Sequence, residues 1–552
     1  MKKVCAVVFV IAICSCNKGG DASPPVPPTP ETFTLTSIVV NGQPLSPVAY
    51  AIPLSATIRL KFSAPVQAAS AAAIQLLSAT SVAGLTTSLE QGDSTVVVSA
   101  VGGLQPLTKY TLSVTADLRS RKGTALQAAY NSTFVSAIDS SDKFPRIGDE
   151  ALLTLVQRQH FRFFWEYGHP VSGMARDRNA NPDLVTSGGT GMGVMAIVAA
   201  IHRNFITRTE GLARIEKIVN FLRNNTQKYH GAFAHFINGS TGATIPFSTK
   251  DNGGDLVETA LLMQGLLTAR QYFNAADVQE TSLRAGINEL WNGVDWSWYR
   301  KGGEEVLYWH WSPDYQWDIN LKISGWNEAL IVYLLAASSP ANPIPKSVYD
   351  AGWARNGAIR NNATYFGVPL PLGPPQGGPL FFAHYSFLGL DPNGLSDAYA
   401  NYWDQNVAHT KINYRYSVAN PKGWNGYSEA VWGLTASDNN SSGYAAHEPA
   451  NDLGIISPTA ALSSMPYTPA ESMAALKFFY YTLGDKTWKE YGFVDAFNLS
   501  NPWFAPSHLA IDQGPIIIMI ENHRSGLLWD LFMSAPEIKQ GLTRLGFASP
   551  HL

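Results

Sequence analysis

Glu258 is the residue of this 552-residue sequence whose surroundings most need an explanation. It lies in the stretch GGDLVETALLMQGLLTARQYF (253–273), which is apolar on nearly every side if it forms a helix. An unpaired carboxylate in such a helix is costly or becomes protonated. We therefore expect Glu258 either to pair with an Arg elsewhere in the chain or to face a wet cavity and do acid–base chemistry there.

A second group of carboxylates lies in GMARDRNANPDLVTSGGTG (173–191). Asp177 stands between Arg176 and Arg178, and Asp183 follows in the loop that leads into an apolar helix. A neighbouring guanidinium favours the ionised form of a carboxyl group, so this loop is a candidate source of a catalytic base. For both residues the structural alternative is a salt bridge that holds the loop together.

Carboxylates and aromatic rings also occur together further along the chain, in residues 296–326, 323–336 and 423–438. Flat rings stack on the apolar faces of sugars, and a first-turn carboxylate can either cap a helix or face a cleft. Core packing is the alternative for the Trp side chains. The candidate substrate-binding residues are Trp309, Trp311, Trp326, Glu328, Trp424, Glu429 and Asp438.

Other chemistries find little support in the sequence. The glycine-rich stretch SGGTGMG (187–193) lacks the Lys of a phosphate-binding loop, so close packing of a loop against a helix is the better interpretation. No Gly-x-Ser-x-Gly elbow occurs, and the 12 His show no zinc-site spacing. We predict no catalytic metal and no cofactor. With 39 Lys and Arg against 42 Asp and Glu, no basic field favours nucleic acid.

The N-terminus has the pattern of a bacterial lipoprotein signal. Residues 1–16 combine Lys2 and Lys3 with an apolar run, and they end in a lipobox whose Cys16 would carry the lipid. A short transmembrane anchor is the alternative. Residues 17–32 form a Pro-rich linker. The pattern predicts a protein anchored in the bacterial cell envelope, on its periplasmic or outer surface.

Residues 33–137 alternate in short apolar runs that are separated by turn signals such as Asn41-Gly42 and Lys122-Gly123. This spacing predicts an all-β sandwich. The runs IRLKFSAPV, LQPLTKYTLSVTADLRSRKGTAL and STFVS resemble those of bacterial Ig-like domains, which are usually spacers. The segment contains no Trp, because all 15 Trp lie at or beyond Trp165, so a carbohydrate-binding role is the weaker alternative.

From residue 138 to residue 552 the apolar period becomes helical. Several of the expected helices are apolar all round, which fits a double-layered helical toroid better than a bundle. The fold class we predict is therefore an all-α catalytic domain preceded by the Ig-like sandwich. The expected helices are 149–167, 189–204, 208–229, 255–273, 278–291, 324–338, 346–358, 379–389, 396–418, 426–435, 467–482, 485–491, 514–532 and 535–545.

Seven segments together resemble the glycoamylase-like domain family, which includes the bacterial β-1,2-glucanases of glycoside hydrolase family 144. They are GMARDRN, TSGGTGMGVMAIVAAIHR, GGDLVETALLMQGLL, SGWNEALIVYLLAASSP, GPLFFAHYSFLGLDP, GWNGYSEAVWGLTASD and IDQGPIIIMIENHRSGLLW. The resemblance implies an (α/α)6 toroid that hydrolyses β-1,2-glucan. It puts the essential acidic residues on Glu258 and on Asp177 or Asp183, and it puts Glu328 and Asp438 in the cleft.

Glycoside hydrolysis needs one protonated carboxyl group and one ionised carboxylate. We expect Glu258 to be the general acid, Asp177 or Asp183 to be the general base, and the anomeric configuration to be inverted. Endo cleavage is the first expectation, and exo release of sophorose is the alternative. Weaker alternatives are α-glucan cleavage by a glucoamylase, a polysaccharide lyase, and a glycan-binding lipoprotein without catalysis.

Overall fold

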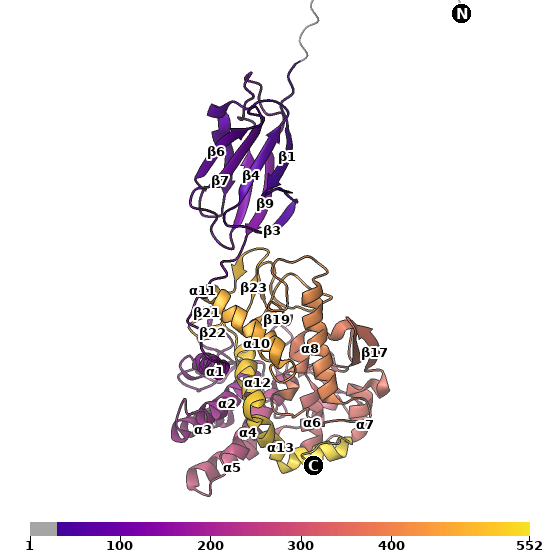
Figure 1. Cartoon of the computed structure of the whole chain (residues 1–552). Helices are drawn as coiled ribbons and strands as arrows, with labels where there is room; N and C mark the ends of the chain where they lie inside the picture. The colour runs from indigo at the N-terminus through magenta and orange to yellow at the C-terminus, as the bar shows by residue number, and fades with distance from the viewer. Residues whose placement is uncertain (1–29) are drawn as a thin grey trace, which may run out of the picture. The chain divides into compact units, whose positions relative to one another are not determined.

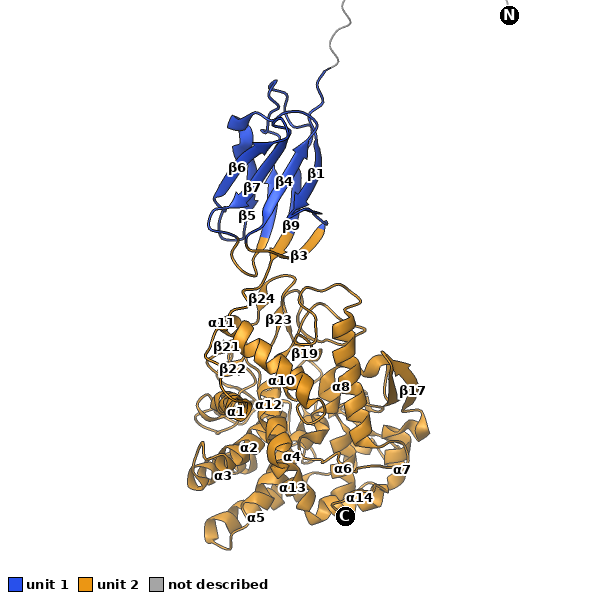
Figure 2. Cartoon of the chain, in the orientation of Figure 1, with its two compact units in different colours: residues 1–47, 55–103, 110–133 blue, residues 48–54, 104–109, 134–552 orange. Residues whose placement is uncertain are grey.

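The computed structural model describes residues 30–552, so the predicted signal, Cys16 and most of the linker lie outside the described residues. The chain divides into two compact units (Figure 2). One contains the residues up to Pro47, Ser55–Gly103 and Tyr110–Thr133. The other contains Val48–Leu54, Leu104–Lys109 and Phe134–Leu552. No helix among residues 30–552 is long and apolar enough to cross a membrane.

The N-terminal strands form two sheets, as predicted for an Ig-like sandwich (Figure 1). One sheet has the order β2-β1-β4-β7-β6 and the other the order β3-β9-β8-β5. Asn41 and Gly42 both adopt positive φ, which is the conformation that a tight hairpin turn requires there. The strands are β1 (Leu35–Val40), β2 (Gln43–Pro44), β3 (Val48–Ile52), β4 (Thr57–Phe62), β5 (Ile74–Leu77), β6 (Leu85–Glu90), β7 (Thr95–Ala100), β8 (Lys109–Val114) and β9 (Tyr130–Ser136).

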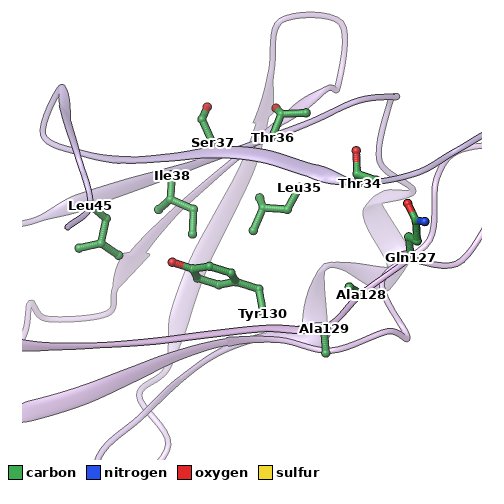
Figure 3. Close-up of a pocket in the computed structure, with 10 residues that line it drawn as sticks. All are labelled: Thr34, Leu35, Thr36, Ser37, Ile38, Leu45, Gln127, Ala128, Ala129 and Tyr130. Atoms are coloured by element: carbon green, nitrogen blue, oxygen red, sulfur yellow. The ribbon is translucent and has the colours of Figure 1, made fainter. Parts of the chain in front are cut away.

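A hollow of about 370 Å³ opens between β1 and the segment 127–130 of this sandwich (Figure 3). Leu35, Ile38 and Tyr130 point into it, whereas Thr36 and Ser37 point away. Its lining contains one aromatic ring and no carboxyl, imidazole or cationic group. It therefore offers no acid–base chemistry.

The second unit is built mainly from helices, many of them close to their predicted ranges (Figure 1). They are α1 (Asp149–Trp165), α2 (Ser187–His202), α3 (Arg208–Asn224), α4 (Leu256–Tyr272), α5 (Val278–Gly293), α6 (Leu330–Ser338), α7 (Lys346–Val348), α8 (Tyr402–Ala419), α9 (Pro458–Leu462), α10 (Pro469–Lys477), α11 (Gly484–Thr487), α12 (Ala510–Ser525), α13 (Leu527–Ser534) and α14 (Pro536–Leu545).

Short strands lie between the helices and pair with one another in sheets of two or three strands. They are β10 (Leu184–Thr186), β11 (Phe236–Asn238), β12 (Thr244–Ile245), β13 (Gly254–Asp255), β14 (Leu307–Tyr308), β15 (His310–Trp311), β16 (Lys322–Ile323), β17 (Arg360–Tyr365), β18 (Val368–Leu372), β19 (Ala436–Asn439), β20 (Gly443–Ala446), β21 (Trp488–Lys489), β22 (Gly492–Phe493), β23 (Phe497–Asn498) and β24 (Trp503–Phe504).

The helices that are apolar all round form the inner layer. Residues 187–201 of α2, 256–270 of α4 and all of α6 are buried, whereas α1, α3 and α5 bury one face each. Glycines let α2 and α4 approach closely, because a Cβ on Gly191 would lie 2.2 Å from the Leu261 carbonyl oxygen. The SGGTGMG stretch is thus a packing motif, as predicted.

Two predicted helices are wrong, and a third, 485–491, is helical only to Thr487, because residues 488–489 form β21. Residues 426–435 form turns that lead to β19, because Gly426 and Gly433 adopt φ values of 82° and 125°, which no α-helix contains. Residues 379–389 form two short 3₁₀ segments, 380–383 and 386–388. In both stretches tertiary packing rather than helical periodicity fixes the backbone.

Candidate active site

Glu258 lies in a pocket of about 240 Å³ in the helical unit. Within the described residues this pocket combines acidic, basic and aromatic side chains from segments far apart in the sequence. We call it the Glu258 pocket; its lining consists of His235, Asp255, Val257, Glu258, Leu261, Trp309, Glu328, Phe381, Tyr385, Ala436, Tyr444, Ala446 and Ile511.

The first turn of α4 positions Glu258. Asp255 is the N-cap of this helix, and its Oδ1 accepts hydrogen bonds from the backbone N–H groups of Val257 and Glu258, both at 2.9 Å. The Glu258 side chain is only 5% exposed, and its Oε2 accepts hydrogen bonds from Thr186 Oγ1 at 3.0 Å and from the Gly188 amide at 2.8 Å. Burial raises the pKa of Glu258. Its carboxyl group faces the cavity and pairs with no Arg of residues 30–552, so the first of the two sequence-based explanations is wrong.

His235 places a positive charge beside this carboxyl group. Its Nδ1 lies 3.3 Å from Oδ2 of Asp255, and the indole Nε1 of Trp309 donates to the same oxygen at 3.3 Å. Burial by itself would lower the pKa of His235, but the negative charges of Glu258 and Asp255 outweigh burial and raise it to about 9. At neutral pH the imidazole is therefore protonated.

Glu328 adds a third carboxyl group to the pocket. Burial raises its pKa to about 7, and the nearby charges of Asp255 and Glu258 act in the same direction. Asp251, close to this wall, also has a pKa raised by burial, to about 6. A carboxyl group whose pKa is raised toward 7 keeps a proton over part of its population near neutral pH, and in that form it can donate a hydrogen bond to a hydroxyl-rich ligand.

The wall around Tyr444 is backed by a network of charged groups. Arg178 donates from Nε to Oδ2 of Asp177 at 3.0 Å and from Nη1 to Oδ1 of Asp438 at 3.2 Å. Ser507 donates to the other oxygen of Asp438 at 2.6 Å. Asp438 on β19 lies directly opposite Tyr444 on β20. Arg178 and Asp177 are thus connected through Asp438 to a strand that lines the pocket.

Asp183 lies elsewhere. Its side chain is 56% exposed, and its Oδ1 is 3.2 Å both from His169 Nε2 and from Ser240 Oγ. These contacts tie the loop down, which was the structural alternative for this residue. The structure does not bring Asp183 to the Glu258 pocket.

Some of the predicted substrate-binding residues lie at the Glu258 pocket and others lie elsewhere. Trp309 and Glu328 line the pocket, and Asp438 belongs to the charged network behind Tyr444. Trp326, expected to face a cleft, is instead 5% exposed and packs in the core against Trp353 and Tyr402.

Three further predicted residues do not line this pocket. Trp311 lies on β15 with its ring against His230. Trp424 donates from its indole to Asp452, and Glu429 is exposed. None of the three is part of the pocket lining.

A pair of carboxyl groups behind Tyr444 was not predicted. Asp495 and Asp512 are each 2% exposed, and burial raises the pKa of both, with the charge of Asp495 acting in the same direction on Asp512. Asp495 Oδ2 accepts the Asp438 amide at 2.6 Å, whereas neither oxygen of Asp512 has a hydrogen-bond partner in residues 30–552. Two buried neighbouring carboxyl groups resist ionising together, so the pair favours keeping a proton.

Sequence reasoning also missed Asp255 and His235. Asp255 could have been found, because an Asp three residues before a Glu at the start of an apolar run is a helix-capping signature. No local signal marks His235, which reaches the site only through tertiary packing. In residues 30–552 no group of three or more His, Cys, Asp or Glu side chains is arranged to hold a metal ion.

Comparison with known families and proteins adds independent evidence. A model of the Glycoamylase family, described as "Putative glucoamylase", matches residues 320–536, and a model of the bacterial Ig-like domain matches residues 36–136. The exo β-1,2-glucooligosaccharide sophorohydrolase (non-reducing end) of Parabacteroides distasonis is 46% identical over 446 residues, which are 77% of this chain. The match spans 61% of that relative's length.

Two solved structures match this chain over a larger share of their own length than the sophorohydrolase does. The endo-β-1,2-glucanase of Chitinophaga pinensis, in complex with sophorotriose and glucose, is 50% identical, with 74% of this chain and 100% of that chain covered and a TM-score of 0.72. A β-1,2-glucanase from Parabacteroides distasonis is 38% identical, with 95% of this chain and 74% of that chain covered and a TM-score of 0.71. This chain therefore belongs to the glycoamylase-like family of glycoside hydrolases, the family that its motifs resemble, and carries a bacterial Ig-like domain before its helical toroid.

Proposed function

We propose that this chain hydrolyses β-1,2-glucan as an endo-acting enzyme and releases short oligosaccharides. The observation that carries the proposal is the Glu258 pocket, in which a buried, hydrogen-bonded carboxyl group of raised pKa faces aromatic and carboxylate side chains. The endo-β-1,2-glucanase of Chitinophaga pinensis, with half of its aligned residues identical, supports the choice of substrate and of endo cleavage.

In the proposed mechanism Glu258 is the general acid. Its proton passes to the glycosidic oxygen as the bond from that oxygen to the anomeric carbon breaks. A water molecule attacks the anomeric carbon from the opposite face, so the configuration is inverted, and its proton passes to an ionised carboxylate. We assign that role to Asp177 rather than to Asp183, because Asp177 is held by Arg178, which also binds Asp438 opposite Tyr444, whereas Asp183 points to solvent.

Exo release of sophorose is the second candidate. The observation in its favour is the 46% identity to a sophorohydrolase that acts from the non-reducing end. Both candidates use the same pocket and the same acid. They differ in whether a chain can extend past the pocket in both directions.

The test is to measure reducing ends and product sizes from linear β-1,2-glucan and from starch. Mixed short β-1,2-oligosaccharides are expected, with no product from starch. Sophorose as the sole early product would replace the endo assignment by the exo assignment. NMR of the first product should show the inverted anomer.

A matched pair of variants tests the role of Glu258. Glu258→Gln should lower turnover by about 10²–10⁴-fold while binding persists. The exposed Glu429→Gln should behave as wild type. Near-normal turnover of E258Q would refute the assignment of the acid. If the wild type released nothing but bound the glucan, it would be a glycan-binding protein, and an ultraviolet-absorbing unsaturated product would identify a lyase.

We further propose that Cys16 is lipidated and anchors the enzyme in the cell envelope. The support is the lipobox and the Pro-rich linker that follows it. Metabolic labelling with an alkyne fatty acid should mark the wild type but not Cys16→Ser, and the variant should leave the membrane fraction. Equal labelling of both proteins would refute the anchor.

A further inference from the structure

Phe247 is a large apolar side chain that is 55% exposed. It follows β12 and begins a tight turn, in which its amide donates to the Asp251 carbonyl at 2.8 Å and the Asp251 amide donates to Ser248 at 3.0 Å. The Asp251 carboxylate lies 3.1 Å from His310 on β15, so the turn is tied to the strand that pairs with β13. Phe247 is therefore held out into solvent by a braced loop.

One side of the Phe247 ring covers the wall of the Glu258 pocket. Its centroid lies 4.7 Å from that of His235, which lines the pocket, and 5.4 Å from that of Phe236. A protonated imidazole near an aromatic ring is an attractive cation–π contact. The ring thus has a favourable contact with the pocket wall, while more than half of the side chain stays open to the approaching ligand.

We propose that Phe247 is a substrate-contacting residue at the mouth of the Glu258 pocket, where its ring stacks on a glucosyl unit next to the bond that is cleaved. This inference rests on the proposed function. The C–H bonds on the face of a glucose ring carry partial positive charge and meet the negative face of an aromatic ring. Such a contact needs no charge, which suits a neutral glucan, and it adds binding energy without taking part in bond cleavage.

The experiment compares Phe247→Ala with Phe366→Ala in the full chain. Phe366 is 40% exposed, lies in the turn between β17 and β18, and is not part of the pocket lining, so it controls for removing an exposed ring. With β-1,2-glucan as substrate, F247A should raise KM about tenfold with kcat within about twofold of wild type. F366A should leave both constants unchanged, and Phe247→Tyr, which keeps the ring, should stay near wild type.

A binding measurement separates this inference from catalysis. Isothermal titration of E258Q with β-1,2-oligosaccharides should give about tenfold tighter binding than titration of the double variant E258Q/F247A. If the wild type releases no sugar from β-1,2-glucan, the proposed function fails, whatever Phe247 does. If the wild type is active but F247A and F366A give the same KM and the same affinity, the inference about Phe247 fails alone.

A purely structural role has a different signature. If the ring only shields His235 from water, F247A would shift the pH profile of kcat/KM and leave KM at the wild-type value at the optimum pH. That outcome would also overturn the proposal. Thermal unfolding of F247A should match that of F366A, since both positions are exposed.

Discussion

The backbone amide of Gly188 donates a 2.8 Å hydrogen bond to Oε2 of Glu258, across 70 residues of sequence. The contact depends on the absence of a side chain, because a Cβ on Gly188 would lie 2.6 Å from the same oxygen. The start of the inner helix α2 therefore supplies both the donor and the space that position the proposed acid on α4.

Gly188→Ala should displace the Glu258 carboxyl group and lower kcat by about 10²-fold, the cost of a small misplacement of a catalytic group. The melting temperature should change little, since Ala favours a helix over Gly. Gly293→Ala is the control, because a Cβ there meets nothing within 4 Å. Activity of G188A equal to that of G293A would show that the contact does not position the acid.

Asp177→Asn and Asp183→Asn should have unequal effects. We expect D177N to lower turnover by about 10²–10⁴-fold, as loss of a general base does, and D183N to stay within a few-fold of wild type. The reason is that Asp183 is mostly exposed and binds only loop residues, whereas Asp177 belongs to the network behind Tyr444. The measurement is the steady-state rate of each variant on β-1,2-glucan. A larger loss of turnover in D183N than in D177N would assign the general base to Asp183 instead of Asp177.

The charge of His235 should set the alkaline limit of activity. Burial raises the pKa of Glu258, and the positive charge of His235 partly offsets this effect. Removing the charge in His235→Asn should raise the pKa of Glu258 further, so the protonated acid persists to higher pH. The alkaline limb of the kcat/KM profile should therefore move upward. His202→Asn, at a half-exposed position outside the pocket lining, should leave the limb in place. A downward shift in H235N would contradict the electrostatic argument.

Asp495 and Asp512 should make stability depend on pH. Because burial raises the pKa of both carboxyl groups, the folded chain keeps a proton that the unfolded chain releases near its ordinary pKa of about 4. Stability is therefore lost as pH rises from about 4 through the raised pKa of about 7 that Asp495 has. Asp495→Asn keeps the acceptor for the Asp438 amide and removes one acid, so it should melt at a higher temperature than wild type at pH 7.5.

At pH 4 the difference in melting temperature between D495N and wild type should shrink. At that pH the pair is protonated in the folded wild type, and unfolding releases only a fraction of a proton. The exposed Asp530→Asn serves as the control. Thermal unfolding at the two pH values checks this prediction. A D495N variant that is less stable than wild type at pH 7.5 would show that the negative charge of the pair stabilises the folded chain, contrary to this prediction.

Local sequence patterns determined the parts of this protein that depend on neighbours in the chain. Alternating runs predicted the strands of the sandwich, and apolar stretches predicted the inner helices α2 and α4 close to their observed ranges, because periodic burial depends on residues a few positions apart. The helix predicted over 324–338 forms only from Leu330, as α6. Glu258 was identifiable for the same reason, since a carboxylate in an apolar helix conflicts with its immediate surroundings. Residues 426–435 show the limit, because the apolar spacing predicted a helix there and two glycines with positive φ formed turns instead.

Tertiary structure alone decided which side chains meet. Thr186 and Glu258 are 72 residues apart, and Arg178 and Asp438 are 260 apart, so no local pattern could pair them. No local pattern predicted that Trp326 is buried in the core or that His235 lines the pocket. Which face of a helix or loop is buried, and against which partner, depends on how distant elements pack. That packing brought Glu258 and Glu328 into one pocket and left Asp183 and Glu429 outside it.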